Sequence, residues 1–398
     1  MRDIHRSTTT WLARRTGRVS TARPPHRSHR RRLTLEPLES RALLSTFTVN
    51  SLGDTGTGSG LSGDLRYVIT QVNQTTGDNT INFAVTGTIT LNSALPDLSN
   101  TTGVTDIEGP GATSLTVARN SAAGTADFGV FTVDANVQAQ LVGLTITGGL
   151  AISGGGGINN AGTLTVTNST IDNNSSSAYG SYGGGIDNTG TLTVTNSTID
   201  NNSSSAYGSY GGGIWNSGTL TVANSIIDNN SATTNTYGSG SSYGGGIDNT
   251  GTLTVTNSTI DHNIANNDID ALSGSYGTGS YGGGIYSTGT LNLDQCTLSG
   301  NVAFVANGGV PSGAPSGAFA SAFGGAVYST GDLTLDDCTI SSNSAEGGAG
   351  YAAPGYEGPT YTAGNASGGG VYVGLGTVHI NGSSPKTSVI YYPCSRCT

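Results

Sequence analysis

Four aspartates recur at one position of a repeated stretch of the chain: Asp172, Asp200, Asp228 and Asp261. Each follows an aliphatic residue predicted to point inward, so the carboxyl groups should face outward and stack about 4.8 Å apart in neighbouring repeats. At that spacing like charges repel by roughly 1 kcal/mol in water. Calcium would relieve the repulsion because it accepts several carboxylate oxygens, whereas screening by water and salt is the simpler alternative. We expect no cofactor, with calcium in this column as the open exception.

Tyrosines form a second candidate site, in segments between the repeats that are rich in glycine and serine. Tyrosine supplies a large contact area at low entropic cost, and serine and glycine supply adaptable hydrogen bonds. This composition is typical of a surface that binds a glycan or a protein; the alternative is that the rings fold back over the chain as filler. The candidate binding residues are Tyr179, Tyr182, Tyr207, Tyr210, Tyr237, Tyr243, Tyr276 and Tyr281.

Residues suited to catalysis are scarce. A glycosidase needs two positioned carboxyl groups, one of them with a raised pKa, and proton transfer near neutral pH favours histidine. No Lys or Arg lies between Arg119 and Lys386, and His262 and His379 are the histidines of that interval. His262 replaces an asparagine of the repeat, which favours a solvated turn. The sequence predicts a non-catalytic protein, with a polysaccharide lyase or glycoside hydrolase as the alternative.

Charge divides the chain into two parts. Residues 1–45 contain 11 arginines and three acids, whereas residues 46–398 contain four basic residues and 22 acids. The larger part lacks the cations that neutralise the phosphates of a nucleic acid, so no nucleic-acid partner is expected. The arginine-rich part is predicted to be a disordered targeting segment. No apolar run approaches the roughly 20 residues of a membrane helix.

A repeat positions these residues. Counted from an aliphatic anchor residue that follows a glycine triplet, Leu or Val lies at +6 and +8, Ile or Leu at +13 and Asn at +16. The spacing between anchors grows from 28 to 44 residues, and the growth falls after the +16 Asn. Insertions confined to one point map to one corner of a stacked structure. The anchors are Gly155–Ile158, Gly183–Ile186, Gly211–Ile214, Gly244–Ile247, Gly282–Ile285, Gly324–Val327 and Gly368–Val371.

The repeat predicts an all-β fold, a single-stranded parallel β-helix (solenoid). Segments such as Thr191–Thr195 alternate strictly, so Leu and Val point inward and Thr points outward. Three short strands per repeat, joined at Gly and Asn corners, make one coil. A coil buries about four aliphatic side chains, worth roughly 1.5–3 kcal/mol each. Because ordering the coil costs more than that, coils are stable only when stacked.

Two further repeat positions carry polar or sulfur side chains. The +16 Asn is predicted to form an internal hydrogen-bonded ladder, the alternative being a simple turn asparagine. At +11, Cys296 and Cys338 replace serines and have the parity of the buried +13 residue. Stacked side chains run parallel, whereas a disulfide needs a χ3 near ±90°. We therefore predict two reduced, buried, stacked thiols in preference to a disulfide.

The repeat resembles a known family. Gly-Gly-Gly-Ile followed by Ile-x-x-Asn is similar to the paired GGA(I/L/V) and FxxN repeats of chlamydial polymorphic outer-membrane proteins, with Ile or Leu in place of Phe. Upstream, Leu65–Ile69, Thr80–Phe83 and Leu144–Gly149 resemble the opening of bacterial surface β-helix proteins with a pectin-lyase-like fold. The resemblance covers about residues 46–383. It implies a right-handed β-helix with irregular first coils and a short capping helix near Leu65–Asn73.

The segment Leu35–Ser45 resembles the LEPR-XLL motif, which follows an arginine-rich stretch in planctomycete surface proteins and implies export. We therefore expect an extracellular or cell-surface, adhesin-like scaffold that binds a glycan or a protein. The expected organisation is a targeting segment (1–45), a cap with irregular first coils (46–132), regular coils (133–383) and a tail outside the repeat (384–398). Unpaired strand edges on the last coil would promote end-to-end self-association.

Overall fold

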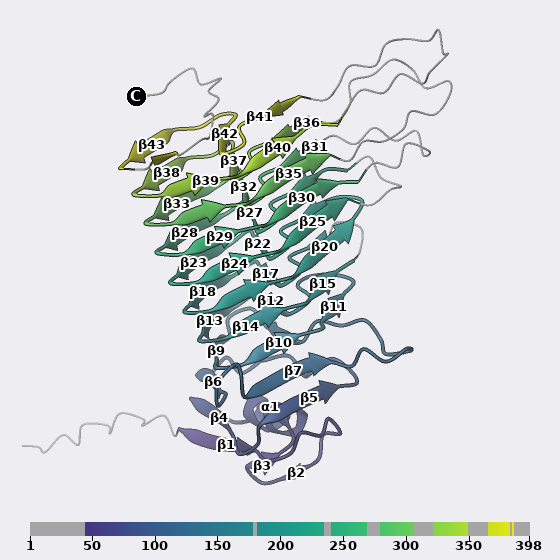
Figure 1. The fold of residues 1–398 in the computed structure, drawn as a ribbon. Helices are drawn as coiled ribbons and strands as arrows, with labels where there is room; N and C mark the ends of the chain where they lie inside the picture. Colours follow the sequence, from purple (N-terminus) through teal and green to yellow (C-terminus); the bar gives the residue numbers. More distant parts are fainter. Residues whose placement is uncertain are drawn as a thin grey trace, which may run out of the picture. The chain divides into compact units, whose positions relative to one another are not determined.

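The computed structural model describes residues 44–177, 181–234, 240–268, 279–305, 321–348, 365–382 and 384–385. Within these ranges nearly all regular structure is β-strand, and one α-helix, α1 (Leu65–Gln74), lies near the beginning. The strands form five sheets, which we name A to E, and successive turns of the chain stack on one another (Figure 1). The chain is a parallel β-helix, as the repeat predicts.

A full coil contributes five strands, two more than the repeat pattern indicates. The chain passes through sheets C, A, B, D and E in turn, and the glycine triplet then leads it into sheet C of the next coil. The two additional strands flank the insertion point, where the stacked coils supply the hydrogen-bond partners that a lone Ser- and Gly-rich segment lacks. The coil that begins at Ile186 consists of β17 (Ile186–Asn188), β18 (Thr191–Thr195), β19 (Thr198–Asp200), β20 (Ser203–Ala206) and β21 (Ser209–Tyr210).

Sheets A, B and C enclose the main core. In the described part of the chain their strands pair in parallel, apart from one antiparallel pair at the start of sheet A. Sheet A contains, in spatial order, β2 (Gly58–Ser59), β3 (Ser62–Gly63), β1 (Ser45–Val49), β4 (Asn79–Phe83), β6 (Val104–Glu108), β9 (Gln138–Val142), β13 (Thr163–Thr167), β18, β23 (Thr219–Ala223), β28 (Thr252–Thr256), β33 (Thr290–Asp294), β38 (Leu333–Asp336) and β43 (Val378–Asn381). Sheet B contains β5 (Gly87–Leu91), β7 (Leu115–Arg119), β10 (Thr145–Thr147), β14 (Thr170–Asp172), β19, β24 (Ile226–Asp228), β29 (Thr259–Asp261), β34 (Thr297–Ser299), β39 (Thr339–Ser341) and β44 (Ser384–Pro385). Sheet C contains β8 (Phe131–Val133), β12 (Ile158–Asn160), β17, β22 (Ile214–Asn216), β27 (Ile247–Asn249), β32 (Ile285–Ser287), β37 (Val327–Ser329) and β42 (Val371–Val373).

Sheets D and E form an extension beside the main core, which we call the side lobe (Figure 1). Its interior is built from small residues: Ala303, Val305 and Ala322 form a separate buried cluster. Buried serines tie the two sheets together, as where Ser209 Oγ donates to Thr233 O at 2.7 Å. Sheet D contains β11 (Leu150–Ala151), β15 (Ser175–Ser176), β20, β25 (Ser231–Thr234), β30 (Ile264–Asn267), β35 (Val302–Val305) and β40 (Ser344–Glu346). Sheet E contains β16 (Ser181–Tyr182), β21, β26 (Ser242–Tyr243), β31 (Gly279–Tyr281), β36 (Ser321–Phe323) and β41 (Ala366–Ser367).

The main core is a set of aliphatic columns. Pairing without a register shift places Leu192 between Leu164 and Leu220, and all three side chains are at most 1% exposed. The anchor residue and the +13 residue stack in the same way in sheets C and B. The predicted inward positions are confirmed, and the chain gains its stability from columns that no single coil could bury.

The +16 asparagines form the predicted ladder at the corner between sheets B and D. Each Nδ2 donates to the Oδ1 of the next coil at 2.9–3.0 Å, and the backbone N–H of the same residue donates to that oxygen too. The corner can therefore bury an amide side chain in every coil without leaving it unpaired. The members are Asn174, Asn202, Asn230, Asn263, Asn301 and Asn343.

A second amide ladder, which sequence reasoning missed, lies at the corner between sheets C and A. Asn160, Asn188 and Asn216 each donate through Nδ2 to the Oδ1 of the next coil at 2.6–2.7 Å. Asn249 ends the amide run by donating to Ser287 Oγ at 3.0 Å. The signal was an asparagine at +2 in four successive coils. It was overlooked because Asn at the end of a short strand also reads as an ordinary turn residue.

The third corner, between sheets A and B, carries serines and then two cysteines. Ser197 Oγ accepts from Ser169 N at 3.1 Å, and the same contact recurs in later coils. Cys296 and Cys338 occupy the equivalent position, and each is a thiol, outside any disulfide, and 1% exposed. The Cys296 thiol donates to Val255 O at 3.3 Å. The predicted pair of buried, stacked thiols is confirmed.

The capping helix α1 begins after Asp64. Its carboxylate accepts from Tyr67 N through Oδ1 and from Thr57 N through Oδ2, both at 2.9 Å, so one side chain caps the helix and fixes the preceding loop. Leu65, Val68, Ile69 and Val72 on one face are buried. The helix predicted near Leu65–Asn73 is confirmed, and it packs against the first strands of sheet A (Figure 1).

Candidate binding site on an aromatic face

Sheet E places a tyrosine at one outward position in four successive strands. Tyr182, Tyr210, Tyr243 and Tyr281 stand in register, with ring centroids 5.2–5.3 Å apart. Phe323 continues the column, and its ring is 5.8 Å from that of Tyr281. The separation follows from the spacing of hydrogen-bonded strands, because equivalent residues of successive coils lie one strand apart.

A second aromatic column runs beside the first on the outward face of sheet C. Its rings contact those of sheet E from one coil to the next: the centroids of Tyr182 and Trp215 are 4.6 Å apart, and those of Tyr243 and Tyr286 are 4.7 Å apart. The two columns therefore make one continuous surface. We call it the aromatic strip, and its members are Tyr182, Tyr210, Trp215, Tyr243, Tyr281, Tyr286, Phe323, Tyr328 and Tyr372.

The glycine triplet brings the two columns together. Gly211 has a φ of +62°, and a Cβ on it would lie 2.1 Å from Ile214 O. A Cβ on Gly212 would lie 2.3 Å from Gly245 O of the next coil. Only glycine accepts both the left-handed backbone and such a close approach. The tight turn sets the residue four places before the anchor near the residue one place after it, as with Tyr281 and Tyr286, whose ring centroids are 6.3 Å apart.

The rings of the strip partly cover one another and remain partly exposed. Tyr182, at the end of its column, is 37% exposed, and the other members are half-buried. Each stacked pair contributes about 0.5–1.5 kcal/mol beyond its buried area, so the strip also stabilises the side lobe. Burial, with smaller contributions from neighbouring tyrosines, raises the pKa of Tyr281 to about 12. Its hydroxyl therefore remains a hydrogen-bond donor at neutral pH.

Two aspartates interrupt the sheet C column. Asp187 and Asp248 lie on either side of Trp215 in the outward position. They are 7% and 1% exposed, and within the described residues the Oδ1 of each is buried without a hydrogen-bond partner. Burial raises the pKa of Asp187 to about 7 and that of Asp248 well above its ordinary value. The strip thus contains two carboxyl groups that are held in an apolar setting.

The structure brings four of the eight predicted tyrosines together, namely those of the sheet E column. Tyr207 lies in the connection between β20 and β21. Tyr179, Tyr237 and Tyr276 lie outside the described residues. Sequence reasoning missed the sheet C members, which directly follow the anchor residue. The signal was an aromatic residue at +1 in four of the seven coils, but it was read as an ordinary outward strand position.

The aspartates of sheet B form a second acidic column. The register places Asp172, Asp200, Asp228 and Asp261 one strand apart, each partly exposed. Burial and the like charges of Asp200 and Asp261 raise the pKa of Asp228. Asn201 Nδ2 donates to Asp200 Oδ2 at 2.7 Å, so turn asparagines offset part of the charge. The column bears the like-charge repulsion that its repeat position predicts.

His262 adjoins this acidic column. Its φ is +48°, close to those of the asparagines that it replaces, so the predicted turn position is confirmed. Its Nδ1 lies 3.0 Å from Asp261 Oδ2 and 3.7 Å from Asp228 Oδ1. These three residues could supply one ligand atom each to a divalent cation. Carboxylates alone suit calcium, whereas the imidazole shifts the preference of the group toward transition metals.

A pair of carboxyl groups on sheet A comes nearest to catalytic geometry. Burial, the like charge of Glu108 and a hydrogen bond with it raise the pKa of Asp106 to about 6. Glycosidases hold their two carboxyl groups about 5–9.5 Å apart, to admit the sugar or a water. Because Asp106 and Glu108 contact each other directly, they leave no such gap. Sequence reasoning missed this pair, and its geometry does not favour glycoside hydrolysis.

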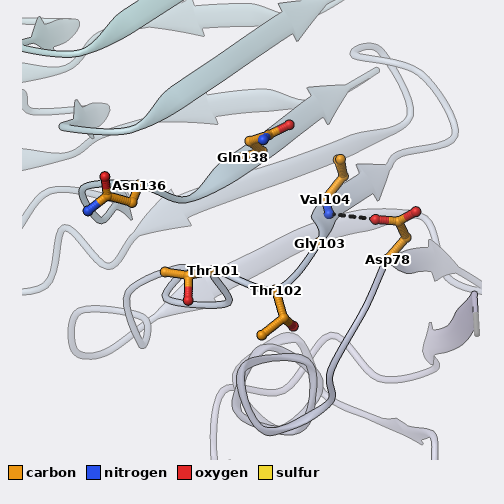
Figure 2. Close-up of a pocket in the computed structure, with 7 residues that line it drawn as sticks. All are labelled: Asp78, Thr101, Thr102, Gly103, Val104, Asn136 and Gln138. Carbon is orange, nitrogen blue, oxygen red and sulfur yellow. Dashed lines mark hydrogen bonds between the residues drawn. The ribbon is translucent and has the colours of Figure 1, made fainter. Parts of the chain in front are cut away.

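A shallow polar hollow lies at the start of β6 (Figure 2). Asp78 Oδ1 accepts a hydrogen bond from Val104 N at 2.9 Å, so this carboxylate stabilises the turn that leads into β6. Among the residues that line the hollow, Asp78 is the one that can titrate, so the hollow offers no acid–base pair. The lining is completed by Thr101, Thr102, Gly103, Asn136 and Gln138.

Comparisons with protein-family models, curated proteins and solved structures give no match for this chain. Across the residues that the structure describes, no helix is long and apolar enough to cross a membrane. The case for a function therefore rests on the chain's own surfaces, and the aromatic strip is the most ordered of them.

Proposed function

We propose that this parallel β-helix is a secreted or cell-surface scaffold, adhesin-like and non-catalytic, whose aromatic strip binds a glycan or protein partner. The strip itself carries the proposal: nine aromatic side chains are aligned along successive coils, and each is partly exposed. Aromatic residues are enriched at protein interfaces and dominate binding hot spots.

Two properties of the strip suit it to binding. Stacking fixes each ring between neighbours, so a partner meets side chains that have already lost their rotamer freedom, which reduces the entropic cost of association. The strip also repeats one contact from coil to coil, so an extended partner can engage several equivalent positions at once. Weak individual contacts would then add up to a stable attachment.

Resemblance to exported proteins supports the location. The glycine-triplet and Ile-x-x-Asn repeat is similar to that of chlamydial polymorphic outer-membrane proteins. The upstream segments Leu65–Ile69, Thr80–Phe83 and Leu144–Gly149 resemble the opening of pectin-lyase-like surface proteins. Leu35–Ser45 resembles the LEPR-XLL motif of planctomycete surface proteins. Each resemblance points to a protein that works outside the cytoplasm.

The experiment measures binding of the full chain to immobilised neutral polysaccharides, uronate polysaccharides and proteins of either charge. Tyr210→Ala with Tyr243→Ala should weaken binding at least tenfold, because two central rings are lost. Tyr210→Phe with Tyr243→Phe keeps the stack and isolates the hydroxyl groups. Thr193→Ala with Thr221→Ala, on the outward face of sheet A, is the matched control and should stay within twofold of the parent chain.

Equal binding by the Ala variant and the parent chain would contradict the proposal. The same polysaccharides, incubated with the chain and then analysed for shortened or unsaturated products, test the enzymatic alternative. Product release that persists through further purification of the chain would establish a polysaccharide lyase or hydrolase in place of a scaffold.

A further inference from the structure

Three neighbouring strands of sheet C place two carboxyl groups around one indole. Asp187 on β17, Trp215 on β22 and Asp248 on β27 occupy the same outward position in register. In the following coils this position holds Tyr286, and then two more tyrosines. The aromatic strip therefore has a chemically distinct segment, centred on Trp215.

The carboxyl groups of this segment have no internal counter-ion. Asp187 and Asp248 are 7% and 1% exposed, and in the described part of the chain neither Oδ1 has a hydrogen-bond partner. The sequence contains no Lys or Arg from residue 120 to residue 385. A buried carboxylate without a partner is strongly disfavoured, so such a group takes up a proton instead. Any cation that pairs with these groups must come from outside these coils.

The surrounding rings suit a cation. A cation is attracted to the face of an aromatic ring, and most strongly to tryptophan. The Tyr182 and Trp215 centroids are 4.6 Å apart, and the Tyr210 ring stacks 5.2 Å from that of Tyr182. On sheet C, Trp215 and Tyr286 flank Asp248 in register. Asn159 and Trp215 flank Asp187 in the same way. None of these neighbours is an acidic or basic residue.

We propose that Asp187, Trp215 and Asp248 form a binding site for a cationic side chain, the ammonium or guanidinium group of a basic protein segment. This inference rests on the proposed function and names the partner of the strip. Residues 46–398 contain four basic and 22 acidic residues, a net charge of −18. Such a surface attracts a basic segment and repels uronate polymers and nucleic acids.

Binding follows a defined proton balance. Before binding, burial without a partner favours the protonated form of each carboxyl group. When the ammonium enters, a carboxyl group releases its proton to the solvent and the resulting carboxylate pairs with the cation. Each pair formed in this way releases one proton. A neutral glycan that stacks on the same rings needs no such ionisation and releases none.

The test uses the full chain carrying Trp11→Phe, so that Trp215 is its sole tryptophan. The probes are a capped octapeptide of alternating Lys and Gly, the same peptide with every Lys acetylated, and a neutral glucose hexasaccharide. Trp215 fluorescence reports binding, and calorimetry at pH 6.5 in two buffers of different ionisation enthalpy reports proton release. We expect the Lys peptide to bind, to release protons and to weaken at least tenfold with Asp187→Asn and Asp248→Asn combined.

Asp200→Asn with Asp228→Asn is the matched control, since it removes two acidic side chains from sheet B. It should leave peptide binding within twofold. An equal loss in both double variants, or equal binding of the acetylated peptide, overturns the site. If the hexasaccharide binds and depends on Tyr210 and Tyr243 while the Lys peptide does not bind, the cationic partner is wrong and the strip remains a binding surface. If no probe binds and the strip variants behave as the parent chain on every immobilised partner, both proposals fail.

Discussion

Aspartates occupy outward positions on two faces of the same coils, and their surroundings differ. Residues 183–200 and 244–261 are identical in sequence, and each copy carries one aspartate of each kind, 13 residues apart. Asp187 and Asp248 are buried under aromatic rings, whereas Asp200 and Asp261 lie partly exposed in a column of like charges. The comparison teaches that an outward position does not determine exposure. On sheet C the aspartates have Trp215 and Tyr286 as neighbours in register, whereas on sheet B the aspartates are neighbours of one another.

The two kinds of aspartate therefore differ in what raises the pKa. For Asp248 the cause is burial, which salt cannot screen. For Asp228 like charges on Asp200 and Asp261 add to burial, and those charges are screened within about 8–10 Å at ordinary ionic strength. Asn substitutions keep the shape of each side chain, so they can separate the two causes.

Asp248→Asn should have the largest effect. The raised pKa of Asp248 means that its contribution to stability is fully present below the ordinary pKa of about 4 and is lost as pH rises through the raised value. The variant has no proton to lose, so it should exceed the parent chain by about 3–5 kcal/mol at pH 9 and match it near pH 4. Urea unfolding at both pH values measures this. A variant less stable than the parent at pH 9 would show that the Asp248 carboxylate is stabilised by hydrogen bonds or by a counter-ion in the folded chain.

Asp187→Asn should have a similar but smaller effect in a defined window. Its pKa is about 7, so ionisation of Asp187 should lower the stability of the parent chain between pH 4 and pH 7. Above pH 7 this contribution of Asp187 should change little. A shift of about three pKa units corresponds to about 4 kcal/mol, so we expect the variant to gain up to about 4 kcal/mol over the parent by pH 8. A titration of unfolding midpoints in half-unit steps locates the window. A difference that does not vary with pH would show that Asp187 is ionised throughout.

Calcium should act on the sheet B column and leave the strip aspartates unaffected. A ligand that binds the folded state alone stabilises it, by about 1.4 kcal/mol at ten times its Kd. Millimolar calcium should therefore raise the melting temperature, and Asp200→Asn with Asp228→Asn should abolish the rise, whereas Asp248→Asn should preserve it. Zinc, assayed in parallel with His262→Asn, tests the imidazole. If calcium, zinc and a chelator all leave the melting temperature unchanged, the aspartates of the column bind no metal ion and are solvated by water.

Asp228→Asn should give the smallest change, a gain of about 0.5 kcal/mol at low salt. Removing the central charge relieves repulsion with Asp200 and Asp261, and this gain should fall as salt is raised to 1 M. The gain from Asp248→Asn should persist at the same salt concentration. If both gains respond equally to salt, the distinction between the two aspartate positions is wrong.

The course of the main core could be predicted because its signal is periodic. Leu192 and Val194 recur at fixed distances from the anchor, and a strict alternation of side chains leaves one way to bury them. The +16 ladder and the thiols Cys296 and Cys338 followed from the same periodicity. The local sequence pattern was enough to predict the structure wherever a residue contacts the equivalent residue of the next coil.

The side lobe could not be predicted in this way. Its strands are short and rich in Ser and Gly, residues with low strand propensity, and they pair only because a stacked neighbour offers its backbone. The contact between Tyr182 and Trp215 joins residues 33 positions apart, in different coils and different sheets. Trp215 lies between Asp187 and Asp248 in register, and the local pattern of alternating side chains, which places all three outward, does not indicate that the two aspartates are buried.

The +16 asparagine ladder has a direction that bears on how the chain is made. Each amide donates to the side-chain oxygen of the coil that follows it: Asn174 donates to Asn202, and Asn202 donates to Asn230. It also donates to a backbone carbonyl of the coil before it, as Asn202 does to Ile171 O. The backbone N–H of each of these residues reaches forward in the same way. During synthesis from the N-terminus, the newest folded coil thus ends in donors, and the next coil to emerge brings the acceptor. The ladder makes each completed coil a template for its successor, so that folding can keep step with translation.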